Sequence, residues 1–323
     1  MGVVTPREQQ HRFRIIVAFT LLYICWGSTF MAIAVAVKYM PPFVMGATRF
    51  IASGTLMLAY CALSGRKVLA SKRELLLLGA IGVLLLTTGN VVVGWAEQYV
   101  PSGLSALILA ITPLWVALIE AVTLKKVKLS TKGISGLALG IVGLFILLWP
   151  RIHSTSPMGR IQLWASLALI WAALSWTLGT LLSKYTKVSV DPFTATGWQM
   201  LIAGLGNLSG AALFGEFAQA HWTPSAIGAI AYLVTGGSLL GFTAYIWLLE
   251  HVATAKVATY AYVNPVIAVI LGALVLHEPV DVYIVMGTLV IVVGVVLVTT
   301  ANVKKVKPAI SSSLSKENEV AVS

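Results

Sequence analysis

Ten runs of mostly apolar residues follow one another along the 323-residue chain. Each is close to the roughly 20 residues that a helix needs to cross a bilayer. Because the runs are continuously apolar, they exclude the strands of a β-barrel, in which polar and apolar residues alternate. Charged residues make up only 10% of the chain, against about 25% in soluble proteins. The sequence therefore predicts an all-α integral membrane protein in a lipid bilayer. The ten predicted spans are Ile15–Val37, Pro42–Leu63, Leu75–Ala96, Ser102–Leu124, Gly133–Trp149, Ile161–Leu182, Pro192–Phe214, Ser225–Leu249, Val257–Leu276 and Val282–Ala301.

The basic residues predict how the chain is oriented. If the N-terminus is inside, 18 of the 22 Lys and Arg residues fall in inner segments and three in outer loops. Cytoplasmic loops carry such an excess, so both termini are predicted to be cytoplasmic. Residues 1–14 form a short inner segment, and residues 302–323 are predicted to be a disordered inner tail. The net charge of +11 is thus an orientation signal, and no nucleic-acid partner is predicted.

The two halves of the chain resemble each other, at residues 15–149 and 161–301. The pairs Trp26 with Trp176 and Arg49 with Gln199 lie 150 residues apart, and Gly89 with Gly241 lies 152 apart. Each half holds five predicted spans, an odd number, so the second half would enter the membrane upside down. Inverted repeats are typical of secondary transporters, with the substrate site between the halves. Chance similarity among Leu- and Gly-rich helices is the alternative.

Several motifs carry a family resemblance. They are Trp26-Gly27-Ser28-Thr29, Arg49-Phe50, Ala96-Glu97, Val100-Pro101-Ser102-Gly103, Tyr260-Ala261-Tyr262-Val263-Asn264-Pro265-Val266 and His277-Glu278. With them the sequence resembles the drug/metabolite transporter superfamily, in its ten-span EamA-type branch, and is most similar to YedA-like metabolite exporters. The resemblance implies export of a metabolite or drug across a bacterial plasma membrane and names no substrate. One departure is Lys125-Lys126, where many relatives have an acidic residue.

Charged residues inside the spans are expensive and mark functional candidates. Arg49 and Glu120 lie within spans, and Glu97 lies at the outer end of the third. An Arg49–Glu97 ion pair is predicted to act as an outer latch that opens and closes. A static pair, or a snorkelling arginine, is the alternative. Glu120 precedes Lys125 by about one turn and is interpreted as solvated interfacial charge.

Two mid-span prolines occupy equivalent positions in the halves. Pro113 and Pro265 each lack an N–H and free a carbonyl four residues back, at Leu109 and Ala261. Broken helices with loose carbonyls facing a cavity recur in transporters. Tolerated packing kinks are the alternative.

Polar and aromatic side chains near midplane complete the predicted substrate site. Trp26 and Trp176 are equivalent in the repeat and are expected to stack on a planar or cationic substrate; packed or lipid-facing tryptophans are the alternative. Small polar residues are weaker candidates, because they also join helices. The predicted substrate-binding residues are Trp26, Ser28, Asn90, Thr112, Trp176, Gln199, Tyr260, Tyr262 and Asn264.

Catalytic motifs are missing from the sequence. It has no P-loop, no Gly-x-Ser-x-Gly elbow and no histidine or aspartate inside a span. We therefore predict a non-enzymatic carrier, without cofactor or metal, that exports a small metabolite, amino acid-like or drug-like compound by alternating access. An importer of the same fold and a non-transporting helical membrane scaffold remain alternatives. Proton coupling, exchange and homo-oligomer formation are left open by the sequence.

Overall fold

The computed structural model describes residues 6–124, 127–252, 254–301 and 304–305. The predictions for residues 1–5, for Lys125-Lys126 and for most of the tail 302–323 fall outside this part of the chain. Within that tail, Lys304–Lys305 form β2, which pairs antiparallel with β1 (Val127–Lys128). The rest of the regular structure described is helical.

Eight helical stretches are long and apolar enough to cross a membrane, which confirms the prediction of an all-helical multi-pass membrane protein. Two further predicted spans correspond to α10, which has 22 residues, and to the shorter α14, which has 16. Neither is among the eight, so the number of ten crossings stays a prediction.

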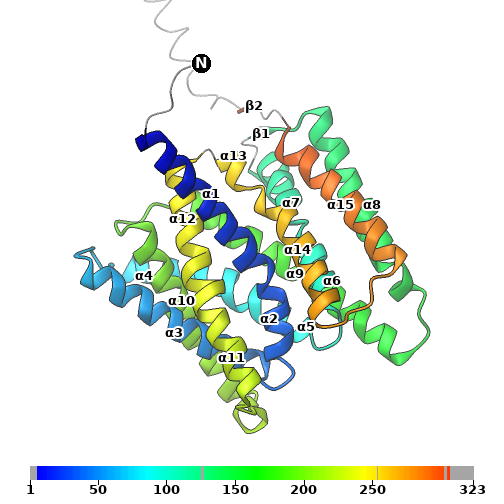
Figure 1. The fold of residues 1–323 in the computed structure, drawn as a ribbon, viewed down its shortest axis with the longest axis horizontal. Coiled ribbons are helices and arrows are strands. Elements are labelled where there is room, and N and C mark those ends of the chain that lie inside the picture. Colours follow the sequence, from blue (N-terminus) through cyan, green and yellow to red (C-terminus); the bar gives the residue numbers. More distant parts are fainter. Residues whose placement is uncertain (1–5, 125–126, 253, 302–303, 306–323) are drawn as a thin grey trace, which may run out of the picture.

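The helices of the first half include several short, broken segments (Figure 1). They are α1 (Pro6–Gly27), α2 (Thr29–Ala36), α3 (Pro42–Leu63), α4 (Lys72–Gly82), the π-helical turn η1 (Val83–Thr87), α5 (Asn90–Ala96), α6 (Ser102–Leu109), α7 (Thr112–Leu118), the π-helical η2 (Ile119–Thr123) and α8 (Thr131–Ile152).

The second half repeats this alternation of long and broken helices. Its elements are α9 (Pro157–Tyr185), α10 (Pro192–Leu213), the 3₁₀ turn η3 (Glu216–Gln219), α11 (Pro224–Tyr232), the π-helical η4 (Leu233–Leu240), α12 (Gly241–His251), α13 (Thr254–Val257), α14 (Tyr260–Val275) and α15 (Val282–Thr299).

Two pairs of uninterrupted helices form the sides of the bundle: α3 lies against α10, and α8 lies against α15 (Figure 1). Glycines make the first pairing close. A Cβ on Gly54 would lie 2.5 Å from the Leu201 backbone nitrogen, and one on Gly204 would lie 2.6 Å from that of Ile51. These two contacts are related by the 150-residue offset. Small residues that let helix backbones approach are typical of membrane helix packing.

Carboxylates from distant loops cap two helices. The Glu216 Oε2 atom accepts hydrogen bonds from the backbone nitrogens of Phe43, at 2.9 Å, and Val44. Glu278 likewise accepts from Ser102 and Gly103. The first N–H groups of a helix have no partner within it and favour negative charge. These contacts tie the starts of α3 and α6 to loops of the other half.

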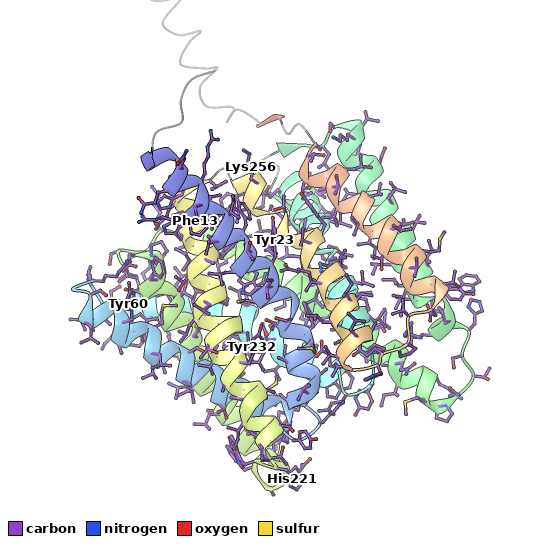
Figure 2. All side chains as sticks on the ribbon, in the orientation of Figure 1. Phe13, Tyr23, Tyr60, His221, Tyr232 and Lys256 are labelled. Carbon is purple, nitrogen blue, oxygen red and sulfur yellow. The ribbon has the colours of Figure 1, made fainter. Side chains whose placement is uncertain are left out.

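The described ends of the chain lie at one end of the bundle. The start of α1 and the β1–β2 pair are at the top of Figure 1. Lys256, predicted to be cytoplasmic, is near that end in Figure 2, whereas His221 lies at the opposite end. This arrangement is what an even number of crossings requires. Which end faces the cytoplasm stays a prediction from the basic residues.

Candidate functional site

A cavity with about 900 Å³ of unfilled space, including its open mouth, lies where the broken helices meet. Its walls are mainly apolar and come from both halves of the chain. The lining residues are Trp26, Thr29, Phe30, Ile33, Arg49, Gly89, Asn90, Val93, Ala106, Leu109, Ala110, Thr112, Pro113, Trp176, Gly237, Phe242, Tyr260, Ala261, Asn264 and Pro265.

Trp26 is the centre of an aromatic wall. Its ring centroid lies 5.2 Å from that of Phe242, 5.2 Å from Tyr245 and 5.1 Å from Tyr260. The indole Nε1 donates to the Gly237 carbonyl at 3.1 Å. That carbonyl belongs to η4, and π-helical turns often mark functional sites. Trp26 sits at the end of α1, just before the chain breaks at Ser28. The wall is therefore fixed in place by its ring contacts and one hydrogen bond.

Arg49 places a cationic side chain at the cavity. It is 3% exposed. Its Nε donates to Ser238 Oγ at 3.1 Å and its Nη1 to Asn90 Oδ1 at 3.2 Å. Both partners are neutral, and the two ion pairs found among the described residues do not involve Arg49. Buried charges are normally paired. Among the described lining residues none is acidic, so this guanidinium has an unused capacity to bind an anion.

The structure does not form the predicted Arg49–Glu97 ion pair. The two ion pairs it shows among the described residues are Arg66–Asp191 and Lys184–Glu120. The reason is the position of Asn90, the partner of Arg49, which precedes Glu97 by seven residues. At 1.5 Å per residue, that separation is roughly 10 Å along the helix. Glu97 is not among the described residues that line the cavity.

Glu120 has different surroundings from those predicted from its sequence neighbours. It accepts from Lys184 Nζ at 2.6 Å and from the Tyr185 hydroxyl at 2.7 Å. Lys125 and Lys126 lie outside the described residues. Glu120 therefore joins η2 to the end of α9, and its charge is partnered across the two halves of the chain.

The two prolines behave differently. Pro113 is the second residue of α7, after a break at Ala110 and Ile111. The Leu109 carbonyl that it frees accepts from the Thr112 hydroxyl at 2.7 Å, so this carbonyl is already occupied. Pro265 lies inside the continuous α14, whose preceding break is at Ala258 and Thr259. Both prolines line the cavity, but the second break occurs several residues before its proline.

Asn264 contributes an unused acceptor. It is buried and lines the cavity, and its Oδ1 has no hydrogen-bond partner within the described part of the chain. A buried amide oxygen without a partner costs free energy. Beside the cavity it offers an acceptor for an N–H or O–H of a bound molecule.

The cavity gathers most, but not all, of the predicted substrate-site residues. Trp26, Asn90, Thr112, Trp176, Tyr260 and Asn264 line it, together with both prolines. Ser28, Gln199 and Tyr262 are not in its lining. The Ser28 hydroxyl bonds to Tyr232 and to the Ile24 carbonyl. Gln199 lies on α10 where its backbone abuts Gly82. Tyr262 is near Tyr23 and Thr259.

Several cavity residues were missed from the sequence. Phe242 occupies the position equivalent to Asn90 at the 152-residue offset, and this signal could have identified it. Thr29 follows the break in the first span. Gly237 contributes through its backbone carbonyl, which no side-chain pattern reveals. Arg49 was assigned to a latch rather than to the cavity because the sequence offered Glu97 as a partner.

The model of the EamA-like transporter family matches residues 13–149 and again residues 163–300. The uncharacterised inner membrane transporter YedA of Escherichia coli strain K12 is 36% identical over 257 residues, which are 79% of this chain and 80% of that protein. The uncharacterised transporter YoaV of Bacillus subtilis is 25% identical, with 88% and 95% covered.

A solved crystal structure is also similar, with a TM-score of 0.61. It is 18% identical in sequence and the match covers 88% of this chain and 97% of that one. At this identity the likeness concerns the fold alone.

Proposed function

Because the chain belongs to the EamA-like transporter family, and is thus a multi-pass membrane transporter of the plasma membrane, we propose that the central cavity is its substrate site. The protein opens this cavity to the two sides of the membrane in turn and thereby exports a small organic molecule. Contributions from both halves support this proposal, because a site between two repeats is the arrangement that alternating access uses. The two matches of the family model, 150 residues apart at their starts, support two inverted repeats.

We propose that the substrate carries a carboxylate and an apolar, planar body. The observation that carries this proposal is Arg49, a buried guanidinium with neutral partners in an otherwise mainly apolar cavity. A guanidinium binds a carboxylate through parallel charge-assisted hydrogen bonds. The wall formed by Trp26, Phe242 and Tyr260 provides stacking surfaces, and the free Asn264 oxygen accepts from a substrate N–H or O–H. An amino acid-like zwitterion with a planar side chain provides all three groups: a carboxylate for Arg49, a planar body for the aromatic wall and an N–H donor for Asn264.

Two alternatives to export of such a molecule make different predictions. An importer of the same fold would show the reverse direction of flux in vesicles of known orientation. A non-transporting helical scaffold would show no substrate-dependent flux. The breaks in the helices around the cavity support a carrier over a scaffold, because such breaks cost backbone hydrogen bonds that a static bundle does not need to lose.

A metabolite screen tests this proposal. The medium of cells that overproduce the chain is compared with that of deletion cells, and compounds that accumulate outside are then loaded into vesicles. We expect the accumulating compounds to carry a carboxylate, and Trp26→Ala and Asn264→Ala to reduce their flux. Normal flux in both variants would contradict the assignment of the cavity. Uptake rather than release would contradict export.

A further inference from the structure

Two carboxylates meet at the predicted outer end of the bundle, away from the cavity. Glu278 follows α14, and both of its oxygens accept from the first backbone N–H groups of α6, at 2.8 Å from Ser102 and 3.1 Å from Gly103. Gly272 leaves room for this contact, since a Cβ there would collide with Glu278 Oε2 and lie 3.1 Å from Ser102 Oγ. Glu278 is thus held as a charged helix cap, which the helix dipole favours.

Glu97 has no comparable support. It is 8% exposed, and neither of its carboxylate oxygens has a hydrogen-bond partner among the described residues. The Ser102 hydroxyl beside Glu278 is completely buried, and it too lacks a hydrogen-bond partner in the part of the chain that the structure describes. An ionised carboxylate buried without a partner is very costly, and such groups usually become neutral. The site therefore contains oxygen atoms of Glu97 and Ser102 that make no hydrogen bond, and the negative charge of two ionised carboxylates would not be balanced there.

The charged groups around Glu97 do not neutralise it. The elements packed on α5 and α6 include α2, α3, η1, α9, α14 and α15. Their basic residues are Arg49, whose guanidinium is bound at Asn90, and Arg160 and Lys184 near the ends of α9. The negative charge of Glu278 acts on Glu97 and raises the pKa of its carboxyl group. The Ser105 hydroxyl has a smaller effect, which lowers this pKa. Glu97 is the first residue after the candidate span Lys72–Ala96. Burial and Glu278 raise its pKa well above its ordinary value.

We propose that Glu97 is a proton-binding site that gates the outer end of the transporter, a role that rests on the proposed transport function. The arrangement that buries Glu97 forms when its carboxyl group carries a proton taken from the outer solution. The proton neutralises the charge and provides an O–H donor for the nearby oxygen atoms. When α5 and α6 separate from α14, water reaches Glu97 and the proton returns to the outer solution. A metal ion would need several further oxygen ligands, whereas a proton needs none.

Infrared spectroscopy tests the protonation directly and requires no substrate. The purified full-length protein in nanodiscs should show the carbonyl band of a protonated carboxyl group at pH 7, where an ordinary glutamate, with a pKa of about 4.3, is ionised. Glu97→Gln should remove the band. A band that is absent from the wild type, or that persists in Glu97→Gln, would overturn the proposal.

A second variant keeps this test valid if Glu97→Gln does not fold. The pH at which the wild-type band disappears should be lower in Glu278→Gln, because the repelling charge is gone. An unchanged pH would show that the two carboxylates are not coupled, against the proposal.

Gating is tested separately with a thiol probe. Val100 is buried and follows Glu97 by three residues in the chain. The variant Val100→Cys, with Cys25 and Cys61 replaced by alanine, is treated with a membrane-impermeant thiol reagent on intact cells. Between pH 6 and pH 9 the labelling rate of this variant should rise. The control is the same variant carrying Glu97→Gln, because its rate rises only through ionisation of the thiol itself. We expect the rise without Glu97→Gln to be about fivefold larger than the rise in the control. Equal rises would contradict gating by a proton, and a rise driven by added Na⁺ at constant pH would assign the site to sodium. Neither assay measures transport, so this proposal and the proposed function can fail independently.

Discussion

The long helix pairs and the broken helices differ in how they use their backbones. In the pair α3–α10 each helix runs for 22 residues without interruption, and glycines bring the two backbones into contact. Most of the helices around the cavity are short, although the 22-residue α3 and the 29-residue α9 contribute Arg49 and Trp176. There η4 is a π-helical turn, the first span breaks at Ser28, and the fourth span breaks at Ala110. The broken helices therefore provide most of the cavity lining, while the long pairs hold the bundle together and α3 adds Arg49 to the cavity.

This difference predicts that substitutions in the two regions fail in different ways. Changes in the α3–α10 contact should lower the amount of folded protein. Changes around the cavity should leave folding largely intact and lower transport. Variants that separate these two readouts test the division.

The largest effect is expected at Gly204. In Gly204→Ala the new Cβ would lie 2.6 Å from the Ile51 nitrogen and 2.9 Å from the Phe50 carbonyl carbon. Because these are backbone atoms, α3 and α10 must move apart, at a cost of about 1–3 kcal/mol. Thermal unfolding in detergent measures the loss. The matched control is Gly206→Ala on the same helix, where the new Cβ meets nothing within 4 Å, and where stability should stay the same or rise. Equal melting temperatures in the two variants would contradict the close contact.

An intermediate effect is expected at Trp26. Trp26→Ala removes the centre of the aromatic wall on which the substrate is proposed to stack, so flux of the accumulating compound per folded molecule should fall by up to about tenfold, since one aromatic pair with the substrate contributes about 0.5–1.5 kcal/mol. The control is Trp171→Ala, because Trp171 is 55% exposed on α9 and is not in the described cavity lining. If both variants lose flux equally, the aromatic wall has no special role.

The smallest effect is expected at Glu216, which follows α10 and accepts hydrogen bonds from the first backbone N–H groups of α3. Glu216→Gln keeps the shape of the side chain and removes the charge that favours the N-terminus of α3, at a cost of about 0.3–1 kcal/mol. The melting temperature should fall slightly, with flux per folded molecule unchanged. Glu250→Gln, at an exposed position in the last turn of α12, should not lower it. A larger loss of flux than of stability would place Glu216 in the transport mechanism.

The sequence predicted the helical membrane fold because apolar runs of this length have few other solutions. Of the nine residues that the sequence predicted to bind substrate, six line the cavity, since polar and aromatic side chains at midplane are rare; their role in binding stays a prediction. Ser28 was misplaced because a helix position alone does not give a direction, and its hydroxyl bonds to Tyr232 in another span.

The role of Arg49 was harder to predict. Its partners, Ser238 and Asn90, depend on the wide turn η4 and on the way the halves pack. A π-helical turn leaves no clear pattern in the sequence, whereas an acidic residue such as Glu97 suggests a partner at once. The break before Pro265 was misplaced for a similar reason: proline lacks one hydrogen bond, but the surrounding packing decides where the helix yields.

Arg49 is proposed to bind the carboxylate of the substrate. The most direct measurement compares flux of the accumulating compound with flux of its neutral amide, in vesicles containing the wild type, Arg49→Lys or Arg49→Gln. We predict that the wild type prefers the acid at least about tenfold, as expected for a charge-assisted hydrogen bond of about 1.5–3 kcal/mol. Arg49→Lys should keep part of this preference, and Arg49→Gln should lose it. Equal wild-type flux for the acid and the amide would contradict the claim, as would recovery of Arg49→Glu flux by Glu97→Arg, which would indicate a latch instead.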